Sequence, residues 1–258
     1  MCGGPQPTDR AKRMALVREI ADRVLTLYNE RILAIGVYGS MARGTDGPYS
    51  DIEMLCVLRS TGEEYSYEWA HGSWKAEVDF YSQDILLQKA AEVDVDWPLT
   101  HGAYCDVLAL YDPEGFFAKL RDTVLSQPQE RFIAAIREVI MGELYELIGK
   151  LRNAQHSGHT AYLPELALNM AKYGAFLVGL ANRRYYSNST RVLEDSLNLP
   201  GRPSGYDTLC RMAMKGELSD PGQVAETCEA FWFGVEQWAA ERNICIEEPR
   251  KIPILNHH

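Results

Sequence analysis

A Gly-Ser turn followed by an arginine is the first feature of this chain that points to chemistry. Gly39 and Ser40 follow an apolar stretch, and Arg43 comes three residues after the serine. Glycine lacks a Cβ and lets a phosphate approach the backbone, serine offers hydroxyl and N–H donors, and a short helix after the turn would direct its positive end at the anion. Arginine could reach the same phosphates with its forked guanidinium. Because most Gly-Ser pairs are only turns, this interpretation needs support from other residues.

Two acids at alternate positions supply that support. Asp51 and Glu53 stand at the start of an apolar segment, and residues i and i+2 of a strand share a face. Their carboxylates could bind one metal ion or bridge two, and Mg²⁺ prefers a few carboxylates together with water and phosphate oxygens. A cation would also offset the cost of burying unpaired carboxylates. The alternative is a strand end with two solvated acids. Ser50 could bind a phosphate or only stabilise the turn.

A third acid of a metal site should come from a neighbouring strand. Glu77 and Asp79 are two residues apart in an alternating segment, so both could face the same ion. The alternative for Glu77 is an ion pair with Lys75 or a position on the surface. The residues alone leave these alternatives open.

Glu143, Glu146 and Lys150 form a second group, spaced three and four residues apart as on one face of a helix. From spacing alone, an exposed Glu-Lys pair is favoured, which contributes only about a few tenths of a kcal/mol. In the functional interpretation, Glu146 takes a proton from an acceptor hydroxyl, which requires a pKa raised toward neutrality, and Lys150 binds a phosphate. A tight pair with Lys150 would instead lower the pKa of Glu146.

The hydrophobic pattern predicts a small sheet flanked by helices and then helices only. The predicted strands are residues 32–38, 52–58, 74–80 and 107–111. The predicted helices are residues 8–28, with Thr8 as N-cap, 82–93 and 113–125, and, after a break at 126–130, residues 132–152, 163–184, 190–199, 206–215 and 221–242. The expected fold is α+β (mixed), with a small mixed sheet in domain 1–127 and a helical bundle in domain 128–258.

The same pattern predicts which side chains face the core. Expected core residues are Met14, Val17, Ile20, Val24, Leu27, Cys56, Ile136, Ile140, Leu144 and Leu147.

Composition limits the class of protein. The chain has 258 residues, is 46% hydrophobic and carries a net charge of −10. This charge argues against a nucleic-acid groove and suits a cationic or neutral small partner, although many soluble proteins are acidic. The six cysteines form no CxxC pair, so reduced thiols are expected. The N-terminal residues lack the apolar core of a signal peptide and no apolar run reaches membrane-spanning length, so we expect a cytoplasmic protein with no membrane partner.

Several segments resemble the aminoglycoside 4'-O-nucleotidyltransferase family, which includes the kanamycin nucleotidyltransferases. They are the Gly-Ser turn with Asp51-Ile52-Glu53, WKAEVDF at 74–80, DWPLTHG at 96–102, GELYELIGKLRN at 142–153 and PSGYD at 203–207. The turn and the paired acids are shared with the wide DNA polymerase beta-like nucleotidyltransferase superfamily, whereas the flanking segments are specific to the aminoglycoside group. The resemblance implies transfer of AMP from MgATP to the 4'-hydroxyl of an antibiotic such as kanamycin or tobramycin, with release of pyrophosphate and drug resistance.

The resemblance also implies roles for individual residues. The expected magnesium ligands are Asp51, Glu53 and Glu77. The expected nucleotide contacts are Gly39, Ser40, Arg43, Ser50, Lys150 and Asn188. The expected aminoglycoside contacts are Glu68, Glu77, Asp96, Glu143 and Glu146. The expected catalytic residues are Asp51, Glu53, Lys150 and Glu146, the last as general base. The chain departs from the family at Gly142, where the family carries an acid, and this affects the expected drug contacts.

The family further implies a homodimer in which each drug site includes residues from both subunits, and clustered carboxylates would attract a polycationic drug. Two other functions are compatible with the residues. One is a nucleotidyltransferase that modifies a protein or another hydroxyl acceptor. The other is a non-catalytic nucleotide-binding module, against which the intact acids and the candidate base argue.

Overall fold

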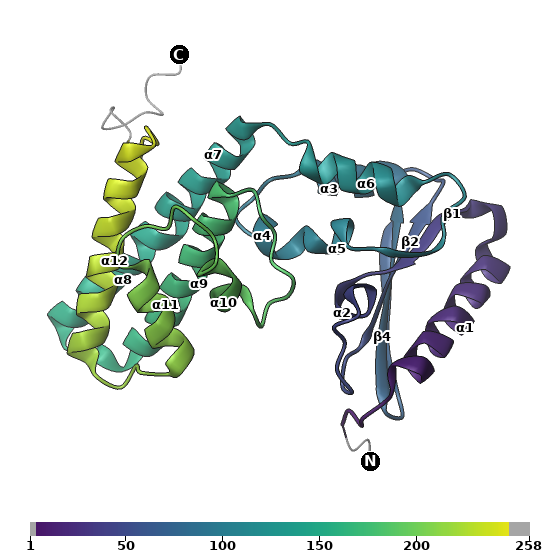
Figure 1. The fold of residues 1–258 in the computed structure, drawn as a ribbon, viewed down its shortest axis with the longest axis horizontal. Coiled ribbons are helices and arrows are strands. Elements are labelled where there is room, and N and C mark those ends of the chain that lie inside the picture. The colour runs from purple at the N-terminus through teal and green to yellow at the C-terminus, as the bar shows by residue number, and fades with distance from the viewer. Residues whose placement is uncertain (1–3, 248–258) are drawn as a thin grey trace. The chain divides into compact units, whose positions relative to one another are not determined.

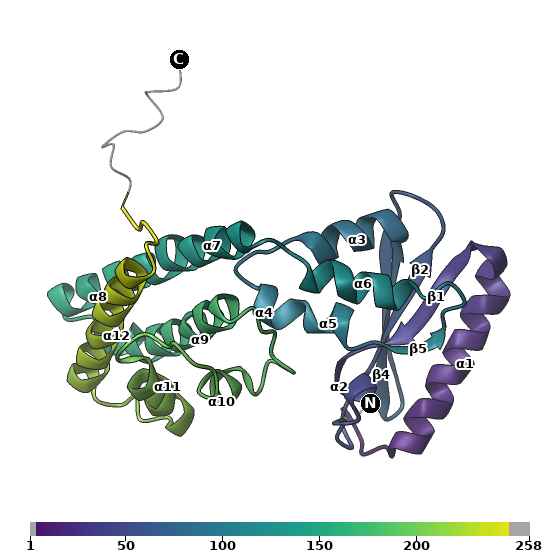
Figure 2. The ribbon, with the colours of Figure 1, turned by 45° about the horizontal axis from the view of Figure 1, so that its top comes forward.

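A computed structural model describes residues 4–247, which form two compact units (Figures 1 and 2). Unit 1 consists of the described residues up to Glu92 together with Thr100–Gln127, and unit 2 consists of Val93–Leu99 together with the described residues from Pro128 onward. The predicted domains are continuous in sequence. The structure differs because Val93–Leu99 belongs to unit 2, where the Trp97 ring lies against the Phe132 ring.

A five-stranded mixed sheet forms the centre of unit 1, with the strands in the order β3-β4-β2-β1-β5. The strands are β1 (Ile32–Val37), β2 (Ile52–Leu58), β3 (Glu64–His71), β4 (Trp74–Ser82) and β5 (Leu108–Tyr111). β2 and β4 are parallel, whereas the other neighbouring strands are antiparallel. The sequence predicted β1, β2, β4 and β5 to within two residues at each end.

Strand β3 was not predicted. It pairs only with β4 at one edge of the sheet, and almost all of its residues are exposed. Its sequence does alternate, because Tyr65, Tyr67 and Trp69 stand at every second position, and this aromatic alternation is the signal that could have revealed the strand.

The first face of the sheet packs against α1 (Arg10–Tyr28) through one apolar cluster (Figure 2). Its members include Val17, Ala21, Val24, Ile35, Val37, Ile52, Met54, Cys56, Ala76, Val78 and Phe80. The cluster confirms Val17, Val24 and Cys56 as core residues, and Met14 and Ile20 are partly buried against it. Leu27 was predicted wrongly. It is the penultimate residue of the helix and is 65% exposed.

The second face is covered only in part, by α3 (Gln83–Ala91) and α6 (Phe116–Leu125) (Figure 1). Gly36 of β1 faces the ring of Phe117 in α6, and Leu55 of β2 is the register partner of Gly36. Glu53 lies two residues before Leu55 and therefore shares this face. The second face thus changes from apolar to acidic toward the beginning of β2.

Unit 1 also contains three shorter elements. The elements are η1 (Asn29–Arg31), α2 (Gly39–Arg43) and α5 (Gly102–Cys105).

Asp9, not Thr8, caps α1, because the Asp9 carboxylate accepts a hydrogen bond from the Lys12 N–H at 2.8 Å. The Thr8 hydroxyl instead lies 3.1 Å from the Ser73 hydroxyl.

The described part of unit 2 is helical. Its elements are α4 (Trp97–Thr100, which ends in unit 1), α7 (Gln129–Glu138), the π-helical segment η2 (Val139–Leu144), α8 (Tyr145–Ser157), η3 (Thr160–Tyr162), α9 (Leu163–Ala181), α10 (Val192–Ser196), α11 (Tyr206–Lys215) and α12 (Pro221–Glu241). Helix α9 contacts α7, α8, α10, α11 and α12 and is largely buried, so it forms the centre of the bundle. No helix within residues 4–247 is long and apolar enough to cross a membrane.

The helix predicted over residues 132–152 is interrupted by η2. Its predicted core residues Ile136, Ile140, Leu144 and Leu147 are all buried. Because a π-helix widens the turn to i→i+5 hydrogen bonding, η2 shifts the side chains of Gly142 and Glu143 relative to a regular α-helix.

Candidate active site

Four carboxylates come together on the second face of the sheet in unit 1. Glu53 of β2 is the register partner of Glu77 of β4, and Asp79 lies two residues beyond Glu77. Asp51 comes just before β2, and all four residues are half-buried. Parallel pairing of two strands that each carry acids at alternate positions thus concentrates negative charge at one point.

The electrostatics of Glu53 show how strongly these acids interact. Burial, together with the neighbouring carboxylates of Asp51 and Glu77, raises the pKa of Glu53 to about 7, although Arg43 opposes the shift. Burial and the Asp79 carboxylate raise the pKa of Glu77 as well. Negative charge on this face is therefore only partly compensated by the protein itself.

The turn before α2 is built around the Glu53 carboxylate. Gly39 has a φ of 68°, and a Cβ at this position would lie 1.9 Å from Glu53 Oε2. The backbone N–H of Tyr38 donates to the Glu53 carbonyl oxygen at 3.0 Å. Gly39 is therefore required both for its conformation and for the space that it leaves to the carboxylate.

Tyr38 connects the same turn to the next strand. Its hydroxyl donates to Asp79 Oδ2 at 2.8 Å. Burial and the Asp79 charge hold the pKa of the Tyr38 hydroxyl well above its usual range, so it remains a donor. Asp79 is thereby fixed beside Glu53. Tyr38 was not predicted as a site residue, whereas Glu77 was. The feature of the sequence that could have identified Tyr38 is an aromatic residue directly before the Gly-Ser turn.

The remaining predicted nucleotide contacts of unit 1 lie around α2. Ser40 is in the first turn of the helix. Arg43, at its end, is largely buried, and its Nη1 lies 3.8 Å from Asp106 Oδ2, while its Nε has no hydrogen-bond partner among the described residues. The Ser50 hydroxyl accepts a hydrogen bond from the Gly47 N–H at 3.0 Å, which is the turn-stabilising role that the sequence left open.

Strand β3 adds one predicted substrate contact to this face. Glu68 is the register partner of Glu77 and is paired with Lys75, whose Nζ lies 2.5 Å from Glu68 Oε1. Lys75 thus forms its ion pair with Glu68, not with Glu77 as the alternative proposed. Glu77 keeps a raised pKa in spite of this nearby lysine.

The residues of this face fit a divalent cation. Within residues 4–247 no group of three or more His, Cys, Asp or Glu side chains is arranged to hold a metal by itself. Mg²⁺ requires less than this, because it keeps water and phosphate oxygens as ligands and takes only one or two carboxylates. Asp51 and Glu53 supply two, and the raised pKa of Glu53 marks negative charge that a cation would stabilise.

The predicted base and its partner lie on α8 of unit 2. Lys150 Nζ lies 2.6 Å from Glu146 Oε1, and the two side chains are 49% and 61% exposed. The Glu146 carboxylate holds the pKa of Lys150 above its usual range. The structure thus contains the exposed i,i+4 pair that spacing alone favours. In this arrangement the pair is neutral overall, and the roles of both residues in catalysis remain predictions.

The other predicted residues of unit 2 have different surroundings. Glu143 lies in η2 and accepts a hydrogen bond from the Tyr173 hydroxyl, and with burial this raises the pKa of Tyr173 to about 12. Asp96 lies in the Val93–Leu99 segment and acts on the same tyrosine through its charge. Asn188 Oδ1 accepts hydrogen bonds from Thr190 Oγ1 at 2.7 Å and from the Arg191 N–H at 3.0 Å, so it stabilises its own turn.

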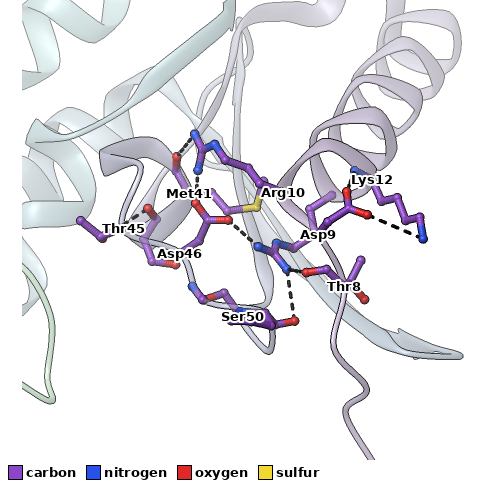
Figure 3. Close-up of polar contacts among 12 residues, drawn as sticks. Thr8, Asp9, Arg10, Lys12, Met41, Thr45, Asp46 and Ser50 are labelled. Atoms are coloured by element: carbon purple, nitrogen blue, oxygen red, sulfur yellow. Dashed lines mark hydrogen bonds and ion pairs between the residues drawn. The ribbon is translucent and has the colours of Figure 1, made fainter.

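A second polar cluster holds the loop between α2 and β2, and the sequence analysis did not identify it (Figure 3). The Asp46 carboxylate accepts hydrogen bonds from both Arg10 and Arg13 of α1. Arg13 and the Asp46 side chain are almost fully buried. The only sequence signal was an acid in a Gly-rich loop and two arginines in a distant helix, which no local pattern connects.

Comparisons with known proteins agree with this architecture. The family model of the nucleotidyltransferase domain matches residues 17–133, and that of the KNTase C-terminal domain matches residues 114–245. A nucleotidyltransferase-like protein from Exiguobacterium sibiricum 255-15, known from a crystal structure, superposes with a TM-score of 0.51 at 11% identity, covering 87% of this chain and 74% of that chain. At this identity the likeness concerns the fold alone.

Two relatives match over almost the entire chain. They are named aminoglycoside nucleotidyltransferase (4'), one from Bacillus sp and one from Staphylococcus aureus. Each is 43% identical over 250 residues, which cover 97% of this chain and 99% of the relative. The chain therefore belongs to the family of aminoglycoside 4'-nucleotidyltransferase enzymes, and this confirms the resemblance seen in its motifs.

Proposed function

We propose that this chain transfers AMP from MgATP to the 4'-hydroxyl group of an aminoglycoside, releases pyrophosphate and thereby confers resistance to the drug. The observation that carries the proposal is the juxtaposition of Asp51, Glu53 and Glu77, all half-buried, on the partly covered second face of the sheet, beside the Gly39 turn. Family membership supports the choice of an aminoglycoside acceptor.

In the proposed site, Asp51 and Glu53 hold Mg²⁺, with Glu77 either on the ion or on an ammonium group of the drug. When bound, Mg²⁺ supplies charge neutralisation for the phosphate chain. Gly39 leaves room for the Glu53 carboxylate, Ser40 offers donors to the phosphate, and Arg43, whose Nε has no partner within the described chain, can donate to it. The protein thus contributes orientation and preorganised charge, as in other phosphoryl transfers.

The reaction replaces a phosphoanhydride bond of ATP with a phosphodiester bond to the drug. The 4'-oxygen of the drug bonds to the α-phosphorus, the bond from that phosphorus to the bridging oxygen breaks, and pyrophosphate leaves with its electron pair. Glu146 accepts the proton of the 4'-hydroxyl. Because Glu146 is paired with Lys150, this role requires Lys150 to turn toward the nucleotide phosphates and release the carboxylate.

The drug is bound by carboxylates in this proposal. Glu68, Glu77, Asp96, Glu143 and Glu146 are the residues that face ammonium groups, and the net charge of −10 favours a polycation over nucleic acid. Gly142 lies in η2 beside Glu143, and the family pattern has an acid at the position of Gly142. This chain and the family pattern therefore differ in their drug contacts at this position. Dependence on ATP makes the cytoplasm the compartment of the reaction.

Mass spectrometry after incubation with kanamycin or tobramycin, ATP and MgCl₂ tests the proposal. The expected product is the drug with one AMP added, together with an equal amount of pyrophosphate. An aminoglycoside without a 4'-hydroxyl should remain unmodified, and full activity on such a drug would refute 4' selectivity. ATP binding without pyrophosphate release for any acceptor would instead indicate a binding module, and AMP on a protein would indicate the other acceptor class.

We further propose a homodimer in which both subunits contribute to each drug site, as the family resemblance implies. Light scattering during size-exclusion chromatography should give twice the chain mass of 29.1 kDa. Mixing two variants, one inactive through Asp51→Asn and one through Glu146→Gln, should restore about a quarter or more of the activity if the sites are shared between subunits. A lack of any recovery would indicate that each site uses one subunit.

A further inference from the structure

The loop between α2 and β2 is exposed, yet its central acid is buried. Residues 44, 45, 47, 48 and 49 of this loop are exposed to solvent, and two of them are glycines. The Asp46 side chain in their midst is only 1% exposed. An exposed, Gly-rich loop loses backbone entropy when it is ordered, so a specific interaction must hold it.

Two arginines from the first turns of α1 provide that interaction (Figure 3). Arg13 Nη2 lies 2.5 Å from Asp46 Oδ2, and Arg10 donates to Asp46 Oδ1. Arg13 also donates to the carbonyl oxygens of Thr8 and, at 3.2 Å, of Pro48. The carboxylate is thus shared by two guanidinium groups, and one of these also holds the loop backbone two residues later.

Arg10 extends the cluster into α2. Its Nη2 donates to the Met41 carbonyl oxygen at 2.9 Å, and Met41 is the central residue of the Gly39–Arg43 helix. The Thr8 N–H donates to the Pro48 carbonyl oxygen at 2.8 Å. The contacts therefore attach α1 to three points of the chain: α2, the middle of the loop, and the residue three positions before Asp51.

We propose that Arg10 and Arg13 are positioning residues for the proposed transfer reaction. Acting through Asp46, they fix the distance between the Gly-Ser turn at one end of the loop and Asp51 at the other. Neither arginine contacts the reacting atoms in this arrangement. Because a displacement of about 1 Å at a reacting centre can reduce the rate a hundredfold, a loop that connects the phosphate-binding turn to the metal-binding acid must be held rigid.

Arg10 is the residue to change first, because it is 43% exposed and its removal leaves the buried Asp46 carboxylate still paired with Arg13. We expect Arg10→Ala to raise the Kd and KM for MgATP about tenfold, with the KM for kanamycin changed less than about threefold and a Tm within a few degrees of wild type. Arg10→Lys keeps the charge but lacks the fork that reaches both Asp46 and Met41, so it should recover only part of the loss. Arg18→Ala, on the same helix and exposed, is the matched control and should change neither constant.

The full-length protein should be studied well below its Tm by calorimetry with MgATP and by steady-state kinetics. A purely structural role would lower the Tm or the active fraction and would leave both KM values unchanged, and this result overturns the inference. So does an equal Kd for MgATP in wild type and Arg10→Ala, whatever the acceptor. A wild-type protein that binds MgATP but adenylylates no aminoglycoside would instead refute the proposed function alone.

A double-mutant cycle tests whether Arg10 acts through the acid. Asp46→Asn keeps the size of the side chain but leaves Arg13 buried without its counter-ion, so its Tm should fall. If Arg10 acts through Asp46, then Arg10→Ala combined with Asp46→Asn should raise the KM for MgATP no further than Asp46→Asn alone. Additive effects on KM would show two independent roles and would contradict the inference.

Discussion

The acids of the sheet in unit 1 and the acids of α8 in unit 2 are the same residue types in opposite electrostatic situations. Glu53 and Glu77 are side by side in parallel strands, half-buried, and both have raised pKa values. Glu146 is exposed and paired with Lys150 on its own helix. Strand register brings like charges together, whereas the i,i+4 spacing of a helix lets an acid find its own counter-ion.

The sheet acids would be stabilised by a bound ligand, whereas a ligand at Glu146 must compete with Lys150 for the carboxylate. The sheet acids lack enough positive partners, so the proposed cation would bind where negative charge is already unfavourable. The helix acid already has a counter-ion, and its proposed use as a base requires breaking this exposed pair, which contributes little to stability. In the proposed mechanism, the first region is prepared for its ligand and the second changes partner when the substrates bind.

The largest effect is expected in the prepared region. Asp51→Asn removes one of two proposed metal ligands, and turnover should fall about a thousandfold or more, because a metal ion contributes several kcal/mol to the charge stabilisation of such a transition state. Asp22→Asn, an exposed acid of α1, is the control and should have no effect. The measurement is kcat with kanamycin, ATP and saturating Mg²⁺. Near-normal turnover of Asp51→Asn would remove this residue from the site.

A smaller loss is expected from the base. Glu146→Gln should lower kcat by at least about a hundredfold, the lower range for a positioned base, with the Kd for kanamycin little changed. Glu138→Gln, at the end of α7, serves as control. If Glu146→Gln has normal kcat and only a lower Tm, then the pair of Glu146 with Lys150 is structural. The sheet acids and the acid of α8 would then differ only in how their charges affect the stability of the fold.

Gly39 in α2 and Gly44 directly after this helix separate backbone strain from the space needed by Glu53. Gly39 and Gly44 have similar φ values, 68° and 71°, but only at Gly39 would a Cβ meet the Glu53 carboxylate. Both alanine variants should destabilise the fold by about 1–2 kcal/mol. Gly39→Ala should also lower kcat/KM for MgATP about tenfold or more, because the carboxylate is displaced. Equal kinetics of the two variants would show that the space at Gly39 does not matter.

The last effect concerns stability and pH, not turnover. The folded-state pKa of Glu53, about 7, lies above the ordinary value of 4.5. Between these values the folded protein keeps a proton that the unfolded chain releases, so without metal its stability should fall as pH rises from 4.5 to 7. The expected loss is on the order of 1–3 kcal/mol, since one pKa unit corresponds to about 1.4 kcal/mol and partial exposure reduces the effect.

Thermal unfolding with a chelator at several pH values measures this loss. Glu53→Gln should flatten the Tm profile between pH 4.5 and 7, and added Mg²⁺ should raise the wild-type Tm most at pH 8. A wild-type Tm that rises through this window would contradict the raised pKa.

The elements with a periodic hydrophobic pattern could be predicted from the sequence, whereas contacts between residues far apart in the sequence could not. Strands with an apolar face, such as β2, were found, whereas the exposed β3 was not. The pairing of Glu53 with Glu77 required knowledge that β2 and β4 are parallel neighbours, and alternation within each strand could only suggest it. The contacts of Arg13 with Asp46 connect residues 33 positions apart, and no periodicity reports such a pair. The roles of Glu146 and Asn188 were predicted from the family resemblance. In the structure, the local contacts of both residues are those of ordinary surface residues.

The π-helical segment η2 has a consequence for chain length. A π-turn accommodates one residue more than the α-turn that spans the same rise, so Val139–Leu144 behaves as a single-residue insertion inside a longer helix. Deleting the exposed Met141 should convert the segment to regular α-helix and leave Ile136 and Leu147 in the core on either side. The deletion would change the direction of side chains inside the segment, Glu143 among them. If Glu143 contacts the drug as proposed, the loss of one codon at this place should change the set of drugs accepted.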